Sequence, residues 1–193
     1  MCIRDRAYQA VSGSGSEAVN SLIQEESLGE KLDSDYEKGF YDRPIARNVI
    51  PLAGNLTENG YSDEEMKFVN ESRKILNIPQ LIVEPSNARV GVKTGHGIFC
   101  SATFEKETDV KEAIGLIDSF DGVEYWKDKL PTPLDAEGSK QVLVGRMRKG
   151  LSDNRILNFW AVSDNLLKGA ALNAVQIARY IVCLLYTSDA ADE

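Results

Sequence analysis

His96 is the residue best suited to carry a proton, because it is the only histidine among the 193 residues. It lies between two glycines in Lys93-Thr-Gly-His-Gly, which leaves room for another group beside the ring. Imidazole is the one side chain whose ordinary pKa lies near neutrality. A lone histidine in a glycine-rich turn is nevertheless more often structural than catalytic, so both interpretations stay open on these residues alone.

Cys100 follows His96 by four residues and raises the question of a cysteine–histidine nucleophile. If this segment is extended, four residues cover about 13 Å, whereas direct hydrogen bonding needs about 3 Å. The spacing therefore favours a buried, unreactive strand cysteine.

Charged residues suited to anionic or zwitterionic ligands occur upstream of the histidine. Glu71 and Lys74 are three apart on a predicted helix and can share a face, although a solvated charged face is the commoner explanation. Arg89 lies among small and apolar residues, where its guanidinium could hold a carboxylate at two points or form a structural salt bridge. Ser12-Gly13-Ser14-Gly15 precedes a predicted helix and is a weak signal for an anion site.

Composition narrows the classes of protein. The net charge of -8 argues against nucleic-acid binding, which requires a basic surface. The longest apolar run near the end, residues 177–186, has about half the roughly twenty residues that a bilayer requires, and no signal peptide is predicted. The cysteines show neither metal-ligand spacing nor a disulfide framework, which favours a reducing cytoplasm: Cys2, Cys100 and Cys183.

The two ends differ in character from the segments beside them. Residues 1–6 (MCIRDR) and 183–193 (CLLYTSDAADE) resemble translated sequencing-adapter read-through, with ordinary frayed termini as the alternative. We therefore set both apart from the fold as non-native tails. On this interpretation the natural protein continues beyond both ends, and residues 7–182 form its domain.

Hydrophobic periodicity predicts an α/β or α+β domain with a mixed sheet. Helices are expected within 14–31, 63–76, 110–120 and 166–182, and the second should begin with a capping box from Ser62 to Glu65. Residues 32–47 are polar and predicted to form a loop. Strands are expected at 48–53, 81–83, 88–92, 98–104, 142–147 and 156–162.

Read in order, several motifs resemble the aspartate-semialdehyde dehydrogenase family. The similarity covers about residues 7–182, and its last block is the most specific. Arg89 and His96 keep the family's seven-residue separation. The other matching segments are Tyr8-Gln-Ala-Val-Ser-Gly-Ser-Gly, Asn48-Val-Ile-Pro, Glu64-Glu-Met-Lys with Glu71-Ser-Arg-Lys-Ile-Leu, Thr132-Pro-Leu-Asp, Val144-Gly-Arg-Met-Arg, and Ser163-Asp-Asn-Leu-Leu-Lys-Gly-Ala-Ala-Leu-Asn-Ala-Val-Gln-Ile-Ala.

The resemblance implies the C-terminal domain of the glyceraldehyde-phosphate-dehydrogenase-like architecture, which has a mixed, largely antiparallel sheet with helices on one face. Family members use this domain for substrate binding and for homodimer formation. They interconvert aspartate semialdehyde plus phosphate with 4-phosphoaspartate, using NADP, in the synthesis of lysine, threonine and methionine. A cysteine attacks the aldehyde as the nucleophile.

The resemblance also implies roles for individual residues. His96 would be the general acid/base and Gln9 would orient the substrate beside the nucleophile. Arg89 would hold the α-carboxylate of the substrate. Glu71 would bind the α-ammonium group and Lys74 would bind phosphate. Contacts with the cofactor would come from Ser12, Gly13 and Asn165.

Departures from the family pattern leave alternatives open. Gly97 and Ile98 follow the histidine where the family usually has serine and an acidic or amide residue. The nucleophilic cysteine and the dinucleotide fingerprint lie upstream of Tyr8 in the family, so we expect this polypeptide alone to be inactive, and preference for NADP over NAD cannot be read from it. An acyl-phosphate reductase of the N-acetylglutamyl-phosphate type and a non-catalytic dimerisation module are the alternative functions.

Overall fold

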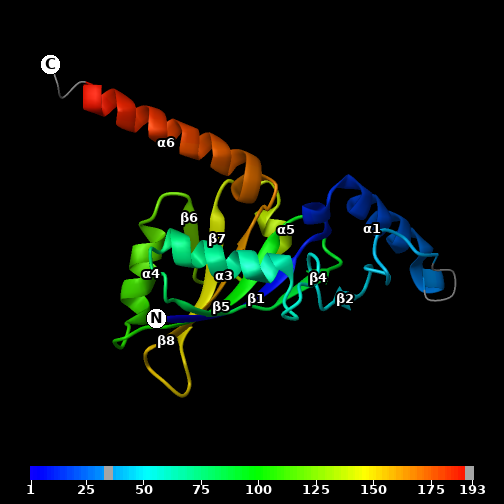
Figure 1. Ribbon diagram of the computed structural model, residues 1–193, viewed down its shortest axis with the longest axis horizontal. Coiled ribbons are helices and arrows are strands. Elements are labelled where there is room, and N and C mark those ends of the chain that lie inside the picture. Colours follow the sequence, from blue (N-terminus) through cyan, green and yellow to red (C-terminus); the bar gives the residue numbers. More distant parts are fainter. Residues whose placement is uncertain (33–36, 190–193) are drawn as a thin grey trace.

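The computed structural model describes residues 1–32 and 37–189 and is built on one eight-stranded sheet (Figure 1). Along the sheet the strands follow the order β2-β4-β1-β5-β8-β7-β6, and β3 also pairs with β1. Antiparallel pairing links β1 to β5, β5 to β8 and β8 to β7, so the sheet is mixed and largely antiparallel as predicted. The strands are β1 Cys2–Gln9, β2 Val49–Ile50, β3 Ile82–Glu84, β4 Asn87–Val90, β5 His96–Thr103, β6 Val123–Trp126, β7 Val142–Lys149 and β8 Ile156–Ser163.

Residues 1–6, which the sequence analysis sets apart from the fold, supply most of β1. This strand pairs in parallel with β3 and β4 on one side and antiparallel with β5 on the other. Strand pairing uses backbone N–H and C=O groups, so a segment without a typical strand pattern can fill the gap between two partners. The expectation that these residues lie outside the fold therefore differs from the structure.

The helices follow the predicted pattern closely. Ser62 accepts a hydrogen bond from the Glu65 amide, and the Glu65 side chain accepts one from the Ser62 amide, which confirms the predicted capping box of α3. Asp109 caps α4, because its side chain accepts hydrogen bonds from the amides of Lys111 and Glu112. The helices are α1 Ser16–Leu28, α3 Asp63–Ile75, α4 Val110–Asp118, α5 Pro133–Ala136 and α6 Leu172–Asp189, with 3-10 turns at Val11–Ser14 and Gly29–Lys31 and a π turn at Leu167–Ala171.

Two predicted segments contain some residues that lie outside the described structure. Within the polar segment 32–47, Leu32 is helical, residues 37–47 form a loop, and residues 33–36 lie outside the described residues. Helix α6 continues through residues 183–189 of the second proposed tail, whereas residues 190–193 lie outside the description (Figure 1). Within the part that is described, no helix is both long and apolar enough to cross a membrane.

The two faces of the sheet have different surroundings. Helix α3 lies across one face, where Val69 packs with Leu81 and Val83 and against Ile3 of β1 (Figure 1). Successive side chains of a strand point to opposite faces. Tyr8 of the same strand therefore points away from α3.

Asp5 is the one ionisable residue among the largest fully buried side chains, with 1 % of its surface exposed. It lies on the α3 side of β1, directly across from Cys100 of β5, and its Oδ1 atom has no hydrogen-bond partner among the described residues. Burial raises the pKa of Asp5 from 3.8 to about 6, although the charge of Arg6 opposes the shift. The buried position of Asp5 therefore favours the neutral carboxyl group over the charged carboxylate.

We predict that Asp5 makes the fold less stable as the pH rises. Because its pKa is raised in the folded state, its contribution to the free energy of unfolding is greatest below pH 4 and is lost as the pH rises through about 6. The loss should be roughly 2–3 kcal/mol. Urea unfolding between pH 4 and pH 7 measures it, with Asp5→Asn as the variant and the exposed Asp121→Asn as the control. A pH slope that Asp5→Asn leaves unchanged would refute this prediction.

Candidate functional site

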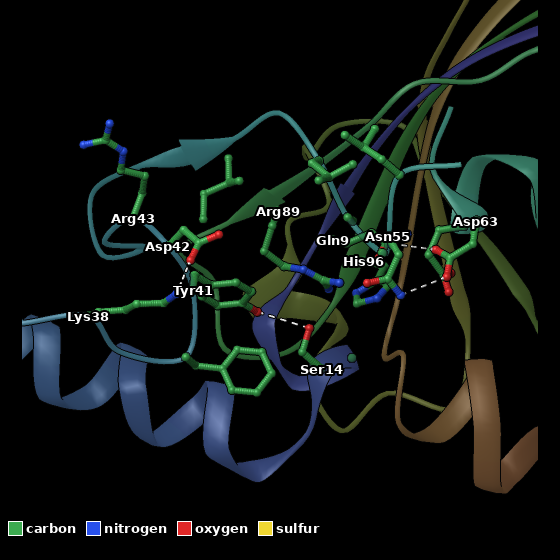
Figure 2. Close-up of a pocket in the computed structure, with 18 residues that line it drawn as sticks. Gln9, Ser14, Lys38, Tyr41, Asp42, Arg43, Asn55, Asp63, Arg89 and His96 are labelled. Atoms are coloured by element: carbon green, nitrogen blue, oxygen red, sulfur yellow. Dashed lines mark hydrogen bonds and ion pairs between the residues drawn. The ribbon is translucent and has the colours of Figure 1, made fainter. Parts of the chain in front are cut away.

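A cavity of about 780 Å³ opens where β1, β4 and β5 meet the loops that follow α1 and β2 (Figure 2). Its lining brings together four residues that are far apart in the sequence: Gln9, Glu64, Arg89 and His96. A smaller cavity of about 160 Å³ shares Gln9, Glu64 and His96 with it and extends under α3. The sheet register accounts for part of this convergence, because Gln9 pairs with Arg89 in β4 and its neighbour Tyr8 pairs with Gly97 in β5.

His96 is the first residue of β5 and points into the cavity (Figure 2). Its Nδ1 atom accepts a hydrogen bond from the backbone N–H of Ala10, 3.1 Å away. Burial and then the nearby charge of Arg89 lower the pKa of His96 from 6.5 to about 4, while Glu64 and Asp164 act in the opposite direction. The imidazole is therefore neutral at physiological pH.

Arg89 presents a buried guanidinium without an acidic partner. Only 5 % of the residue is exposed, and its Nη1 atom donates a hydrogen bond of 2.8 Å to the carbonyl oxygen of Ala10. Its Nε atom is buried and has no hydrogen-bond partner, and none of the ion pairs among described residues includes Arg89. The structural salt bridge considered from the sequence is thus not formed with any residue that the structure describes. A buried cation lacking an anion is a candidate site for an anionic ligand.

Two acidic residues of α3, Asp63 and Glu64, reach the main cavity, whereas Glu71 does not. Asp63 accepts hydrogen bonds from the backbone and side-chain amides of Asn55. Glu64 lines both cavities and accepts a hydrogen bond of 2.5 Å from Lys67, which lines the smaller one. Glu71 lines only the smaller cavity, and Lys74 lines neither. Lys74 lies about 15 Å along the helix axis from Glu64, at 1.5 Å per residue.

Glu64 and Lys67 lie two helical turns before the expected pair, Glu71 and Lys74. It is Glu64 rather than Glu71 that shares the main cavity with Arg89 and His96. Residues 64, 67 and 71 share the α3 face toward the cavities. All three line the smaller cavity together with His96, but of these only Glu64 also lines the main cavity with Arg89. A usable signal was present in the sequence, because Glu64-Glu-Met-Lys repeats the acidic-x-x-basic spacing of Glu71 and Lys74.

The three residues expected to meet a dinucleotide differ in their surroundings. Gly13 lines the main cavity, and a Cβ atom there would lie 3.1 Å from Nε2 of His96 and 3.3 Å from Nη1 of Arg89. A ligand can therefore approach the backbone closely at this residue. Ser12 and Asn165 instead hydrogen-bond each other, and Asn165 also accepts from the Gly95 amide, so they connect the segments around His96.

One wall of the cavity is a loop that sequence reasoning left without a role. It is secured by Glu25 of α1, a buried carboxylate that accepts hydrogen bonds of 2.6 and 2.8 Å from the amides of Ile45 and Ala46. In the same loop, the Tyr41 hydroxyl lies 3.1 Å from that of Ser14 and forms a hydrogen bond with it (Figure 2). The wall therefore depends on a long-range contact that the pattern of residues does not reveal.

Cys100 does not take part in this site. It lies in the middle of β5, lines neither cavity, and its pKa is raised to about 12, chiefly by burial. A thiol in this state is a poor nucleophile. Among the residues with described positions, no group of three or more histidine, cysteine or acidic side chains is arranged to hold a metal ion.

Comparison with known proteins gives a consistent result. Residues 3–168 match the family model for the dimerisation domain of semialdehyde dehydrogenases. The chain is 42% identical over 191 residues to the aspartate-semialdehyde dehydrogenase of Corynebacterium glutamicum and 43% identical over 190 residues to that of Streptomyces akiyoshiensis. These alignments cover 91% and 92% of this chain but 55% and 56% of the relatives, so the chain spans about half of their length.

Solved structures that resemble this chain are also of aspartate semialdehyde dehydrogenases. The crystal structure of aspartate semialdehyde dehydrogenase II from Vibrio cholerae superposes with a TM-score of 0.88 at 37% identity. The match covers 94% of this chain and 54% of that one. A second structure of the same enzyme, with the same TM-score, is described as complexed with ASA.

We predict that Glu25→Gln loosens the wall of the cavity. The substitution keeps the size of the side chain but removes the negative charge of the group that accepts hydrogen bonds from the two backbone amides. This loss should lower the free energy of unfolding by about 1.5–3 kcal/mol. Urea unfolding measures the change, with the exposed neighbour Glu26→Gln as the control. Equal stability of the two variants would show that Glu25 does not hold the loop.

Gly13→Ala should displace the ring of His96. The added Cβ atom would lie 3.1 Å from Nε2 and 3.3 Å from Cε1 of His96 and 3.3 Å from Nη1 of Arg89, closer than ordinary van der Waals contact, so the imidazole must shift by a few tenths of an ångström. Imidazole resonances in NMR spectra report the shift of His96. Gly115→Ala is the control, because a Cβ atom there meets nothing within 4 Å. Unaltered imidazole resonances in Gly13→Ala would contradict the close approach.

Proposed function

The chain belongs to the semialdehyde dehydrogenase family through its dimerisation domain, and we propose that residues 7–182 are the substrate-binding and dimerisation part of an aspartate-semialdehyde dehydrogenase. The enzyme would interconvert L-aspartate 4-semialdehyde plus phosphate with 4-phospho-L-aspartate. The nucleophilic cysteine and most of the dinucleotide site would belong to a further part of the enzyme. The chain on its own would then bind substrate without turning it over.

The observation that carries this proposal is that a buried guanidinium and a carboxylate line one cavity. Among the described residues no acidic side chain forms an ion pair with Arg89, and Glu64 lies in the same lining, so the two offer opposite charges to one ligand. An α-amino acid carries a carboxylate and an ammonium on the same carbon. Its carboxylate would satisfy the Nε and Nη atoms of Arg89, and its ammonium would bind Glu64.

The reacting end of the substrate would lie beside His96 and Gln9. Both side chains line the two cavities, which supports a position for them between the charged head group and the space under α3. Lys67, hydrogen-bonded to Glu64, supplies a positive charge in the smaller cavity and would hold phosphate. These roles replace those that the resemblance gave to Glu71 and Lys74.

NADP is the cofactor that the resemblance implies, and it would accept or deliver the hydride. Gly13 is the residue of this chain that fits such a group, because its missing side chain leaves the backbone open beside His96. Ser12 and Asn165 would keep that backbone in place through their mutual hydrogen bonds.

We also propose that two copies of the protein pair through the sheet face opposite α3. Tyr8, Phe99 and Trp160 form an aromatic cluster there, with ring centroids 4.7 to 6.2 Å apart, and the guanidinium of Arg146 lies over Phe99. Aromatic residues and arginine are enriched in protein interfaces. The homodimer would act in the cytoplasm, in the synthesis of lysine, threonine and methionine.

Binding of two related aldehydes tests the proposed substrate. We expect the chain to bind L-aspartate 4-semialdehyde more tightly than succinic semialdehyde, which lacks the amino group. Glu64→Gln should remove this preference, whereas Glu71→Gln should keep it. Arg89→Lys should weaken binding of both ligands by about 10- to 100-fold, because lysine cannot reproduce the two-point contact.

Titration calorimetry measures these affinities. A loss of preference in Glu71→Gln with none in Glu64→Gln would restore the assignment made from the resemblance. Equal affinity of the unaltered chain for the two aldehydes would favour an acyl-phosphate reductase whose substrate lacks a free amino group.

A further inference from the structure

Asn87 of β4 joins the strand that carries Arg89 to the helix that carries Glu64. Its Nδ2 atom donates hydrogen bonds of 3.1 Å to the carbonyl oxygen of Ala53 and of 2.8 Å to Oγ of Ser62, the N-cap of α3. Its Oδ1 atom accepts a hydrogen bond of 2.9 Å from the Ala53 amide. One side chain thus connects β4, the loop after β2 and the start of α3.

The backbone of the same residue makes a further contact with α3. The N–H of Asn87 donates to Oε1 of Glu65 at 2.9 Å, while Oε2 of Glu65 accepts from the Ser62 amide in the capping box. Glu64 directly precedes Glu65 in the first turn of the helix. The turn that carries Glu64 is therefore attached to β4 on both sides of that residue.

The two charges of the site lie close along the chain to this attachment. Asn87 and Arg89 are two residues apart on one strand, so their side chains leave the same face of the sheet. Glu64 is two residues after Ser62, which Asn87 holds. Within the described part of the chain, every hydrogen bond between β4 and α3 or its N-cap is made by Asn87.

Other contacts of α3 leave its first turn without a comparable link to β4. Val69 is the buried residue of the helix and lies five residues after Glu64. Asn55 and Asp63 exchange hydrogen bonds through their backbones and side chains, which attaches the loop to the helix but not to the strand. The loop and the helix start could therefore shift together if Asn87 did not hold them.

We propose that Asn87 is a positioning residue that sets the spacing between Arg89 and Glu64, and that this spacing makes the cavity selective for an α-amino acid. The inference rests on the proposed function, in which these two groups bind the α-carboxylate and the α-ammonium. Both ligand groups are attached to one carbon atom, so the distance between them is fixed. A shift of α3 would separate Glu64 from the ammonium and leave the carboxylate on Arg89.

The hydrogen bonds of Asn87 support an indirect role. An asparagine side chain has two N–H donors, and both are used within the protein. Although Asn87 lines the smaller cavity, it has no donor left for a ligand. It therefore acts through the position of Glu64.

Asn87→Leu tests this role, because leucine is similar in size to asparagine and makes none of its three side-chain hydrogen bonds. Titration calorimetry compares L-aspartate 4-semialdehyde with succinic semialdehyde, which lacks the ammonium. We expect the preference for the amino acid to fall by about 10-fold, while the affinity for succinic semialdehyde changes by less than about twofold. If the leucine variant does not fold, Asn87→Ala makes the same comparison and leaves room for water beside Ala53.

Asn59→Leu is the matched control. It removes the side-chain hydrogen bonds of another asparagine, in the turn just before α3, without touching β4, and it should keep the preference. An equal loss of affinity for both aldehydes in Asn87→Leu would show that Asn87 serves stability alone. A preference that Asn87→Leu leaves unchanged would overturn the proposal.

A measurement without ligand separates this inference from the proposed function. Amide hydrogen exchange of Glu65 and Met66, in the first turn of α3, should become about tenfold faster in Asn87→Leu and should not change in Asn59→Leu. Unchanged exchange in Asn87→Leu would contradict the positioning role whatever the ligand. Faster exchange, in a chain that shows no preference between the two aldehydes even without substitution, would refute the proposed function and leave the link between β4 and α3 established.

Discussion

The pairing of β1 with β4 on one side and with β5 on the other is the constraint on which the site depends. It places the end of β1 between Arg89 and His96, which are separated from it by about eighty residues of chain. The strand then ends at a peptide unit whose two polar groups are taken up by these side chains. Without this three-strand junction, β4 and β5 would not be joined through β1, and the guanidinium and the imidazole would not both contact the residue that follows it.

The electrostatics of the cavity follow from that arrangement. Burial disfavours a charge on His96, and the neighbouring Arg89 reinforces the effect, so the ring is neutral. Arg89 forms no ion pair within the described part of the chain, and a buried cation without a counter-charge costs free energy that a bound carboxylate would offset. A comparable conflict occurs at Asp5, where burial favours the neutral carboxyl group.

Much of the fold could be predicted because local signals agree with the final structure. The capping box of α3 and the alternating β-formers of β5, β7 and β8 are properties of neighbouring residues. Strand β1 could not be predicted, because its pairing is supplied by partners distant in sequence. His96 was expected in a turn and instead begins β5, since the glycines around it are compatible with both conformations.

The site was predicted only in part, because some of its contacts also join segments that are distant in the sequence. Gln9, Gly13, Arg89 and His96 meet at one cavity, as the resemblance implied, but helix periodicity cannot tell which turn of α3 faces them. Glu64 and Glu71 have equivalent positions on one helical face, and only the placement of α3 over the sheet separates them. The support that Glu25 gives to the cavity wall is a contact between distant segments and leaves no local pattern.

The central claim is that Arg89, Glu64 and His96 bind one amino-acid substrate together. A crystal structure of the chain grown with L-aspartate 4-semialdehyde tests it most directly. The account predicts the α-carboxylate against the guanidinium of Arg89, including its Nε atom, the ammonium against Glu64, and the aldehyde oxygen facing Nε2 of His96. A ligand bound elsewhere, or one that leaves Nε of Arg89 without a partner, would contradict it.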